Sequence, residues 1–228
     1  MTYNICSGRN LRREQNIEFA AAVIRAVQPD FCGVNEVRVG TADAPYDQAD
    51  ALGRLAGYYP VFGRSIDVAG GAYGNALLTR HPLLRREVVH IPDRFAEGER
   101  RVEHRTLLRC VLDLGGTPVA VLSTHFGLTD AEKRSAVETA LSLLAQEENP
   151  VVLMGDLNME PDDGILRPLL DALCDSAGRK GDVMTFPSDV PRVKIDYILH
   201  TNHIRTLSLR TMDTQNSDHR PLIAEMEL

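Results

Sequence analysis

Short apolar runs of strand length dominate the chain, and they constrain its fold more than any other feature of the sequence. The runs that resemble strands cover residues 2–6, 30–35, 58–64, 73–80, 83–91, 105–114, 118–125, 151–154, 194–200, 204–211 and 222–228. About a dozen strands are too many for one open sheet. The sequence therefore predicts two sheets packed face to face.

Four segments carry helical patterns, at residues 14–27, 47–56, 130–146 and 164–173. In residues 130–146 the apolar side chains of Val137, Ala140, Leu141 and Leu144 recur at the spacing of one buried helix face. The helices lie near both ends of the sequence, so they are expected to cover the outer faces of the sheets. The strand-rich middle, residues 58–125, is expected to form an antiparallel meander.

Composition limits the class of protein. The 228 residues are 43% hydrophobic and 25% charged, which is typical of a soluble globular protein. Neither a linker nor a repeat divides the chain, so we expect a single domain over residues 1–228. The N-terminus has no signal-peptide pattern and no stretch approaches the ~20 apolar residues of a membrane span, so a cytoplasmic monomer is expected. A formal net charge of −7 disfavours a protein that coats nucleic acid, although a local basic groove stays open.

Residues 151–158, VVLMGDLN, combine a buried strand with a polar end. Side chains two apart on a strand share a face, so Asp156 and Asn158 are expected to point to a common site. A lone Asn or Asp at such a position is ordinarily a turn former. The shared face makes this pair a candidate for chemistry.

Other predicted strands also end in acids, amides or imidazoles. These residues are Asn4, Glu36, His125, Asp196, Asp218 and His219. Each alone is compatible with a turn or a structural histidine. Together they predict convergence, because carboxylates crowded into one site need a cation. Oxygen ligands suit Mg²⁺ or Mn²⁺ rather than zinc, and the two histidines suit acid–base chemistry.

The motifs TYNI, NE, STHF, GDLN with Pro161, KIDYIL and SDHRPL occur in an order that resembles the endonuclease/exonuclease/phosphatase family. The resemblance covers nearly the whole chain. It implies a four-layer α/β/β/α sandwich, in which two mixed β-sheets pack face to face with helices on the outer faces. It also implies an active site at one end of the sandwich and a Mg²⁺ or Mn²⁺ cofactor.

The resemblance assigns roles to the polar strand ends. Glu36 matches the family's metal-binding glutamate, with Asn4 beside it and Asp218 as a further carboxylate on the metal side. His219 matches the general base that activates water, and Asp196 the carboxylate that orients it. The remaining three catalytic positions contact phosphate, water or metal, and they are His125, Asp156 and Asn158.

Substrate contacts are less marked in the sequence. Two arginine-containing clusters, GRNLRRE and GERRVEHRTLLR, offer Arg9 and Arg105 as candidate phosphate ligands, because guanidinium groups suit phosphate oxygens. The segment YGNALLTRHPL, which also resembles the family, offers Asn75.

Three functions remain open at this level. The favoured one is a Mg²⁺-dependent phosphodiesterase or phosphatase that acts on a small or lipid-derived phosphate ester. A DNA or RNA nuclease is the alternative within the same family. A catalytically inactive binding protein on the same fold is the alternative from another class.

Overall fold

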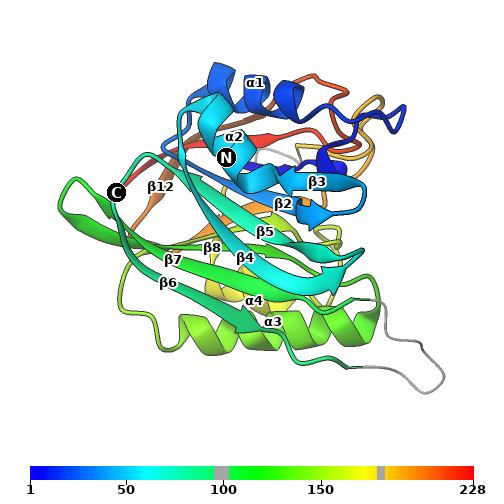
Figure 1. The fold of residues 1–228 in the computed structure, drawn as a ribbon. Coiled ribbons are helices and arrows are strands. Elements are labelled where there is room, and N and C mark those ends of the chain that lie inside the picture. The colour runs from blue at the N-terminus through cyan, green and yellow to red at the C-terminus, as the bar shows by residue number, and fades with distance from the viewer. Residues whose placement is uncertain (95–102, 179–182) are drawn as a thin grey trace.

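The computed structural model describes residues 1–94, 103–178 and 183–228. Two mixed β-sheets pack face to face, with α1 and α2 on the outside of one and α3 and α4 on the outside of the other (Figure 1). This confirms the predicted α/β sandwich. Arg100 and Arg101 of the second arginine cluster lie outside the described residues.

The first sheet has the strand order β12-β13-β1-β2-β5-β4, and β3 pairs with β2. Its strands are β1 (Thr2–Asn4), β2 (Phe31–Thr41), β3 (Ala44–Asp47), β4 (Tyr59–Val68), β5 (Gly71–Thr79), β12 (Arg205–Thr211) and β13 (Leu222–Glu227). The short β1 lies at the centre, parallel to β2 and antiparallel to β13. Strands from near the two ends of the chain, β1 and β13, therefore lie side by side.

The second sheet has the order β10-β11-β9-β8-β7-β6. Its strands are β6 (Leu83–His90), β7 (Thr106–Leu114), β8 (Thr117–His125), β9 (Val151–Asp156), β10 (Cys174–Asp175) and β11 (Asp196–His200). Within it, β8 and β9 are parallel and joined through a helix, whereas the remaining pairs are antiparallel.

The helices are α1 (Ile17–Val27), α2 (Gln48–Ala56), α3 (Asp130–Leu144) and α4 (Arg167–Ala172), with a short 3₁₀ turn, η1 (Cys6–Gly8), after β1. The start of α3 is fixed by a capping box, in which the side chains of Thr129 and Glu132 each accept a backbone N–H of the other residue. None of the helices in the described ranges is long and apolar enough to cross a membrane.

Three layers of apolar side chains hold the sandwich together. A central layer between the sheets includes Leu77, Leu108 and Met154, all fully buried. The outer layers join α1 and α2 to the first sheet, and α3 and α4 to the second. Burial of this apolar surface is the main stabilising contribution to the fold.

The predicted meander is divided between the two sheets, which corrects the expectation for residues 58–125. β4 and β5 form a hairpin in the first sheet, whereas β6, β7 and β8 belong to the second. The chain changes sheets at His81-Pro82, where the His81 N–H bonds to the side chain of Thr79 instead of continuing a ladder. Proline has no N–H to donate, so the turn ends the pairing.

Gly155 makes the close approach of β8 and β9 possible. A Cβ at this position would lie 1.8 Å from the carbonyl oxygen of Thr124, and the backbone φ of Gly155 is +147°. We expect Gly155→Ala to lower the free energy of unfolding by about 3–5 kcal/mol, because the strands cannot both keep their positions. Gly164→Ala is the matched control, since a Cβ there meets no atom within 4 Å. Urea unfolding measures both, and equal midpoints for the two variants would contradict the expectation.

Candidate active site

The register of the second sheet places three of the predicted site residues in one row. His125 ends β8, Asp156 ends β9 and Asp196 begins β11, and Asp156 is the direct cross-strand partner of the other two. His125 Nε2 lies 3.5 Å from Asp156 Oδ2. All three residues are buried, so the end of this sheet presents a carboxylate pair beside an imidazole.

The first sheet supplies Asn4 and Glu36 opposite this row. Asn4 Nδ2 donates to Glu36 Oε1 and to Asp156 Oδ2, both at 3.1 Å, so one amide joins carboxylates of the two sheets. Glu36 has a φ of +61° and lies in a bulge between Val34 and Val37. A bulge turns a side chain away from the regular alternation of the strand. Here it presents Glu36 at the end of the sheet.

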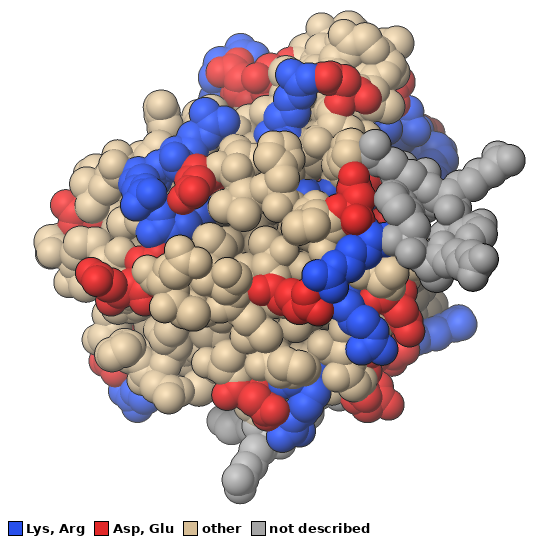
Figure 2. Space-filling model, turned by 90° about the horizontal axis from the view of Figure 1, so that it is seen from below, with Lys and Arg blue, Asp and Glu red and all other residues tan. Residues whose placement is uncertain are grey.

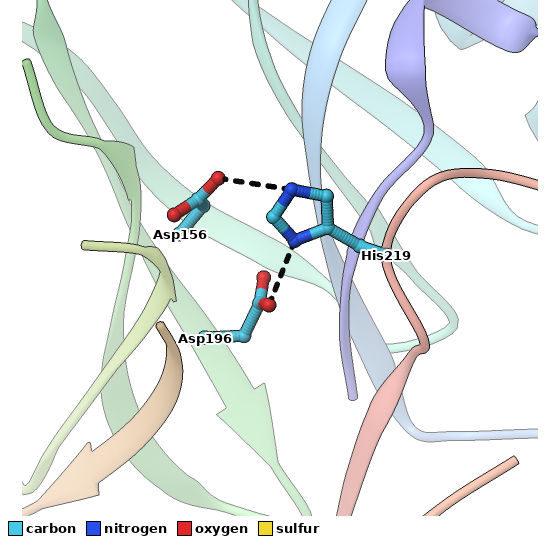
Figure 3. A group of neighbouring side chains, drawn as sticks. All are labelled: Asp156, Asp196 and His219. Carbon is cyan, nitrogen blue, oxygen red and sulfur yellow. Dashed lines mark hydrogen bonds and ion pairs between the residues drawn. The ribbon is translucent and has the colours of Figure 1, made fainter. Parts of the chain in front are cut away.

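His219 completes the group from the turn before β13. Its Nδ1 lies 2.9 Å from Asp196 Oδ2, and its Nε2 lies 3.5 Å from Asp156 Oδ2. Figure 3 shows the imidazole between the two carboxylates, with one ring nitrogen facing each. The Ser217 hydroxyl accepts the His219 N–H at 3.2 Å and donates to the Asn4 carbonyl at 2.7 Å, which anchors the turn on β1.

A cleft of about 360 Å³ opens over these groups. Its walls include Glu36, His125, Asp156, Asn158 and His219 of the predicted site. Residues distant in the sequence therefore face one cavity at the end of the sandwich. This is the convergence that the strand-end pattern predicts.

Burial and charge act against each other on His219 and Asp156. Burial lowers the pKa of His219, but the neighbouring carboxylates of Asp196 and Asp156 outweigh it and raise this pKa to about 10. Burial raises the pKa of Asp156 to about 7, against the opposing charge of His219. His219 and Asp156 therefore titrate as a coupled pair. When no ion is bound, the neighbouring carboxylates keep the proton on the imidazole of His219.

His125 differs from His219 in its charge. Burial lowers the pKa of His125 well below its usual value, and the positive charges of Arg105 and His219 lower it further. Its Nδ1 is buried without a hydrogen-bond partner among the described residues, as is Asp196 Oδ1. A neutral imidazole with a free nitrogen can donate to or accept from a substrate in the cleft.

Asn158 reaches the cleft for a different reason from the one predicted. β9 ends at Asp156, and Asn158 has a φ of +52°, so the two residues do not alternate along one strand. Instead, the Asn158 N–H donates to Asp156 Oδ1 at 3.0 Å, and Asn158 Nδ2 donates to the Phe126 carbonyl at 3.0 Å. A tight turn therefore brings the amide beside the carboxylate.

Asp218 lies on the Glu36 side of the group, next to Cys6. Burial raises the pKa of the Cys6 thiol to about 12, and the charges of Asp218 and Glu36 add to this effect. Asp218 is not part of the cleft wall, and its Oδ1 lies 3.3 Å from Ser217 Oγ. Asp218 is partly exposed and therefore lies close to the site but outside the wall of the cleft.

The three predicted substrate-binding residues occupy different places. Arg105 lies in the cleft wall, is 8% exposed, and forms an ion pair with Glu103 at 2.8 Å. Arg9 is bound to Asp43 at 2.7 Å and is not part of the wall. Asn75 is buried away from the cleft, where its Oδ1 accepts from Asn35 Nδ2 at 2.8 Å. Of the three, the structure brings only Arg105 to the cleft.

Two residues near the site, Asn35 and Arg38, were not predicted from the sequence. Asn35 Oδ1 accepts the Asp156 N–H at 3.1 Å, and its Nδ2 donates to the Thr124 carbonyl at 2.8 Å, so it joins the two sheets below the cleft. Arg38 lies in the cleft wall with its Nη1 bound to Asp43 at 3.1 Å. The position of Asn35 next to Glu36 in the NE motif could have indicated its role. Arg38 lies beyond residue 35, where the predicted strand ended, so no pattern pointed to it.

The donor groups fit a hard divalent cation. Glu36 and Asp156 are joined only by a neutral amide, and Asp156 is buried with a raised pKa, as expected for a carboxylate short of positive charge. Asn4 presents its nitrogen here, because its oxygen accepts the Cys6 N–H at 3.0 Å. Oxygens of Glu36 and Asp156 are thus better placed as ligands than the Asn4 amide oxygen.

A second grouping of ligand-type atoms comprises Asp156, Asp196 and His219, which lie within 4.8 Å of one another. In this group the hydrogen bond between His219 and Asp196 and the ion pair between His219 and Asp156 already account for the proximity. An ion among the three would have to displace the 2.9 Å hydrogen bond. The Glu36 side of the cleft therefore suits a cation better.

Comparison with known proteins agrees with this geometry. The model of the Endonuclease/Exonuclease/phosphatase family matches residues 1–219. The uncharacterized protein YbhP of Escherichia coli (strain K12) is 31% identical over 185 residues, which cover 73% of this chain and 68% of that protein. Exodeoxyribonuclease III of Haemophilus influenzae is 28% identical over 151 residues, but this covers 62% of the chain and 52% of that protein.

The same fold occurs in solved structures. An endonuclease/exonuclease/phosphatase from Beutenbergia cavernae superposes with a TM-score of 0.84 and is 24% identical in sequence. The superposition covers 100% of this chain and 70% of that one. At this level of identity the likeness supports the fold.

Proposed function

Because this chain belongs to the endonuclease/exonuclease/phosphatase family, whose members hydrolyse phosphoesters, we propose that it is a Mg²⁺- or Mn²⁺-dependent phosphoester hydrolase. The proposed substrate is a small phosphate ester. The observation that carries the proposal is the His219–Asp196 hydrogen bond of 2.9 Å beside the buried Asp156, at the floor of a cleft.

His219 is the proposed general base. Its Nδ1 faces Asp196, so the carboxylate fixes the imidazole and stabilises it once it is protonated. Nε2 faces the cleft side of Asp156 and, in the neutral imidazole, is the nitrogen that takes the proton from the attacking water. A cation held by Asp156 would offset one of the two carboxylates that raise the pKa of His219, and so would favour this neutral form. Asp156 and Asn158 orient this water, since both lie in the wall beside His219.

Glu36 and Asp156 are the proposed ligands of the divalent ion, with Asp218 as a more distant carboxylate and Asn4 as the amide that holds the two ligands together. When bound, Mg²⁺ polarises a phosphoryl oxygen and compensates the charge that develops as the ester bond breaks. His125 and Arg105 lie in the same wall and are the proposed donors to the remaining phosphate oxygens.

A nuclease is the second candidate. The sequence similarity to exodeoxyribonuclease III favours it. The net charge of −7 and the pairing of Arg9, Arg38 and Arg105 with acids disfavour it, because binding of a nucleic acid backbone relies on unpaired cations. A binding protein without turnover would have no need for the buried and charged group around His219.

The proposal predicts hydrolysis that depends on a divalent ion. We expect turnover of p-nitrophenyl phosphate or bis-p-nitrophenyl phosphate with Mg²⁺ or Mn²⁺, and loss of turnover in EDTA. The same assay with inositol phosphates, sphingomyelin and plasmid DNA separates the substrate classes. Release of product at an unchanged rate in EDTA would rule out the metal. Plasmid nicking faster than ester hydrolysis would favour the nuclease.

A further inference from the structure

A second cleft opens beside the one that holds His219. It has a volume of about 810 Å³, whereas the inner cleft has about 360 Å³. Its walls come from β4, β6 and the segment before β7, and Ile66 and Glu103 line both clefts. The two clefts therefore adjoin each other, and a molecule whose phosphate lies in the inner cleft can extend past Ile66 and Glu103 towards the outer one.

The two clefts together carry no excess of positive charge. Their walls contain four arginines, Arg38, Arg64, Arg86 and Arg105, and four acids, Glu36, Asp67, Glu103 and Asp156. Each of the four arginines already has a partner in the protein, which is Asp43, Asp67, the Phe62 carbonyl and Glu103 respectively. Three of these arginines are paired with a carboxylate and Arg86 with a carbonyl, so a polyanion would find few uncompensated cations among the described residues of this path.

Mixed charge is also seen on the side of the molecule that carries α3. Figure 2 shows the face seen from below in Figure 1, where basic groups alternate with acidic ones and with uncharged surface. The described residues form no continuous basic band on this face.

The outer cleft instead offers mixed polar groups beside apolar ones. The carboxylate, guanidinium and imidazole groups of Asp67, Arg64 and His90 line this cleft together with the side chains of Ile66 and Val88. Hydroxyl groups both donate and accept hydrogen bonds, so they can bind to all three kinds of group. The backbone of His90 pairs with Thr106, but its exposed imidazole has no hydrogen-bond partner among the described residues and can bind a ligand.

The junction of the clefts also has an unsatisfied donor. Arg105 is 8% exposed, and its Nε is buried without a hydrogen-bond partner among the described residues. A buried donor without a partner is costly, so an acceptor on a bound molecule would stabilise it. Arg105 lies in the inner wall next to Glu103, which both clefts share.

We propose that the outer cleft binds the alcohol part of the substrate, and that this part is uncharged and rich in hydroxyl groups, as in a sugar phosphate. This proposal rests on the proposed hydrolase function. It adds that the single phosphate lies in the inner cleft beside His219, while the sugar ring packs on Ile66 and Val88 and bonds to His90.

The test compares substrates with similar leaving groups. Hexose 6-phosphate and hexyl phosphate are both primary alkyl phosphates, but only the first carries ring hydroxyls. We expect kcat/KM for hexose 6-phosphate to exceed that for hexyl phosphate by about tenfold or more, because the polar groups of the cleft stay unpaired with the second. Hexose 1,6-bisphosphate and a single-stranded oligonucleotide should both react less well than hexose 6-phosphate.

Variants of the outer cleft test whether the preference for hexose 6-phosphate arises there. Val88→Trp fills the cleft and His90→Ala removes its free imidazole, and each should reduce the preference for hexose 6-phosphate about tenfold, chiefly through KM. Leu84→Trp is the matched control, because Leu84 is exposed on the same strand outside both clefts. Unfolding midpoints show whether Val88→Trp folds, and His90→Ala tests the same point without added bulk.

Results that contradict the sugar proposal differ from those that contradict the hydrolase function. Equal use of hexyl phosphate, faster hydrolysis of the bisphosphate or the oligonucleotide, or an unchanged preference in both folded variants would overturn the sugar proposal. In those cases p-nitrophenyl phosphate would still be hydrolysed and the hydrolase function would stand. Lack of turnover on every ester with Mg²⁺ or Mn²⁺ would remove the hydrolase function itself.

Discussion

The variant His219→Ala is expected to lower kcat by about 10²- to 10⁴-fold, which is the usual contribution of a positioned general base. The imidazole of His219 faces both Asp196 and Asp156, whereas His125, the other histidine of the cleft wall, is paired with Asp156 only. The value of KM should change less than kcat, because the base acts on water rather than on the ester. Steady-state kinetics with p-nitrophenyl phosphate measures both constants.

Loss of stability must be separated from loss of turnover in this variant. Removal of His219 leaves Asp156 and Asp196 buried without their shared cation, so the free energy of unfolding should also fall. His200→Ala is the matched control, since His200 is 4% exposed and bonded to Thr206 Oγ1 at 2.8 Å, but lies at the far end of β11 from Asp196. The control should lose stability and keep kcat.

Added imidazole provides a further check on His219. The truncated side chain leaves space in a cleft that is open to solvent, so imidazole from the buffer should restore part of the turnover of His219→Ala. It should have no such effect on wild type or on His200→Ala. A His219→Ala enzyme that is folded and as active as wild type would exclude this residue as the base.

The convergence of the site was predictable because it follows from sheet geometry. Polar residues at the ends of neighbouring strands meet at the same edge, and the register of β8, β9 and β11 places His125, Asp156 and Asp196 in one row. Pairing partners cannot be deduced from periodicity alone. For this reason the resemblance to a family was needed to relate Asn4 and Glu36 to residues over a hundred positions away.

Local departures from regular structure were beyond the sequence pattern. The bulge that presents Glu36 and the left-handed turn at Asn158 both depend on tertiary contacts, since neither residue is a glycine. Arg9 illustrates the same limit. Its position just after β1 suggested that it contacts the substrate. Its guanidinium instead donates to Asp43, which lies in the connection between β2 and β3, 34 residues further along the chain.

Glu36→Gln is expected to reduce kcat/KM by about a hundredfold or more, because metal-assisted charge stabilisation amounts to several kcal/mol and each 1.4 kcal/mol corresponds to a tenfold change in rate. The amide can still accept from Asn4 Nδ2, so the hydrogen bond of 3.1 Å is kept while the negative charge is lost. The effect should weaken at high Mg²⁺ if the variant binds the ion less tightly. Titration of activity with Mg²⁺ measures this shift.

Thermal unfolding tests the same residue without any substrate. An ion at a hundredfold excess over its Kd stabilises the folded state by about 2.7 kcal/mol, which raises the Tm of a chain of this size by about 5–10 °C. Glu36→Gln should lose most of this increase. Glu87→Gln is the matched control, because Glu87 lies on β6 outside both clefts, with its carboxylate 3.6 Å from Arg109.

When no ion is bound, Glu36→Gln is expected to have the opposite effect on stability. Glu36 places a carboxylate next to Asp156 and close to Asp218, with only the neutral Asn4 amide between Glu36 and Asp156, so its charge opposes folding until a cation binds. Glu36→Gln in EDTA should therefore be at least as stable as wild type, and only wild type should gain stability from Mg²⁺. An equal gain in both proteins would place the ion elsewhere, and the group of Asp156, Asp196 and His219 would then be the site to test.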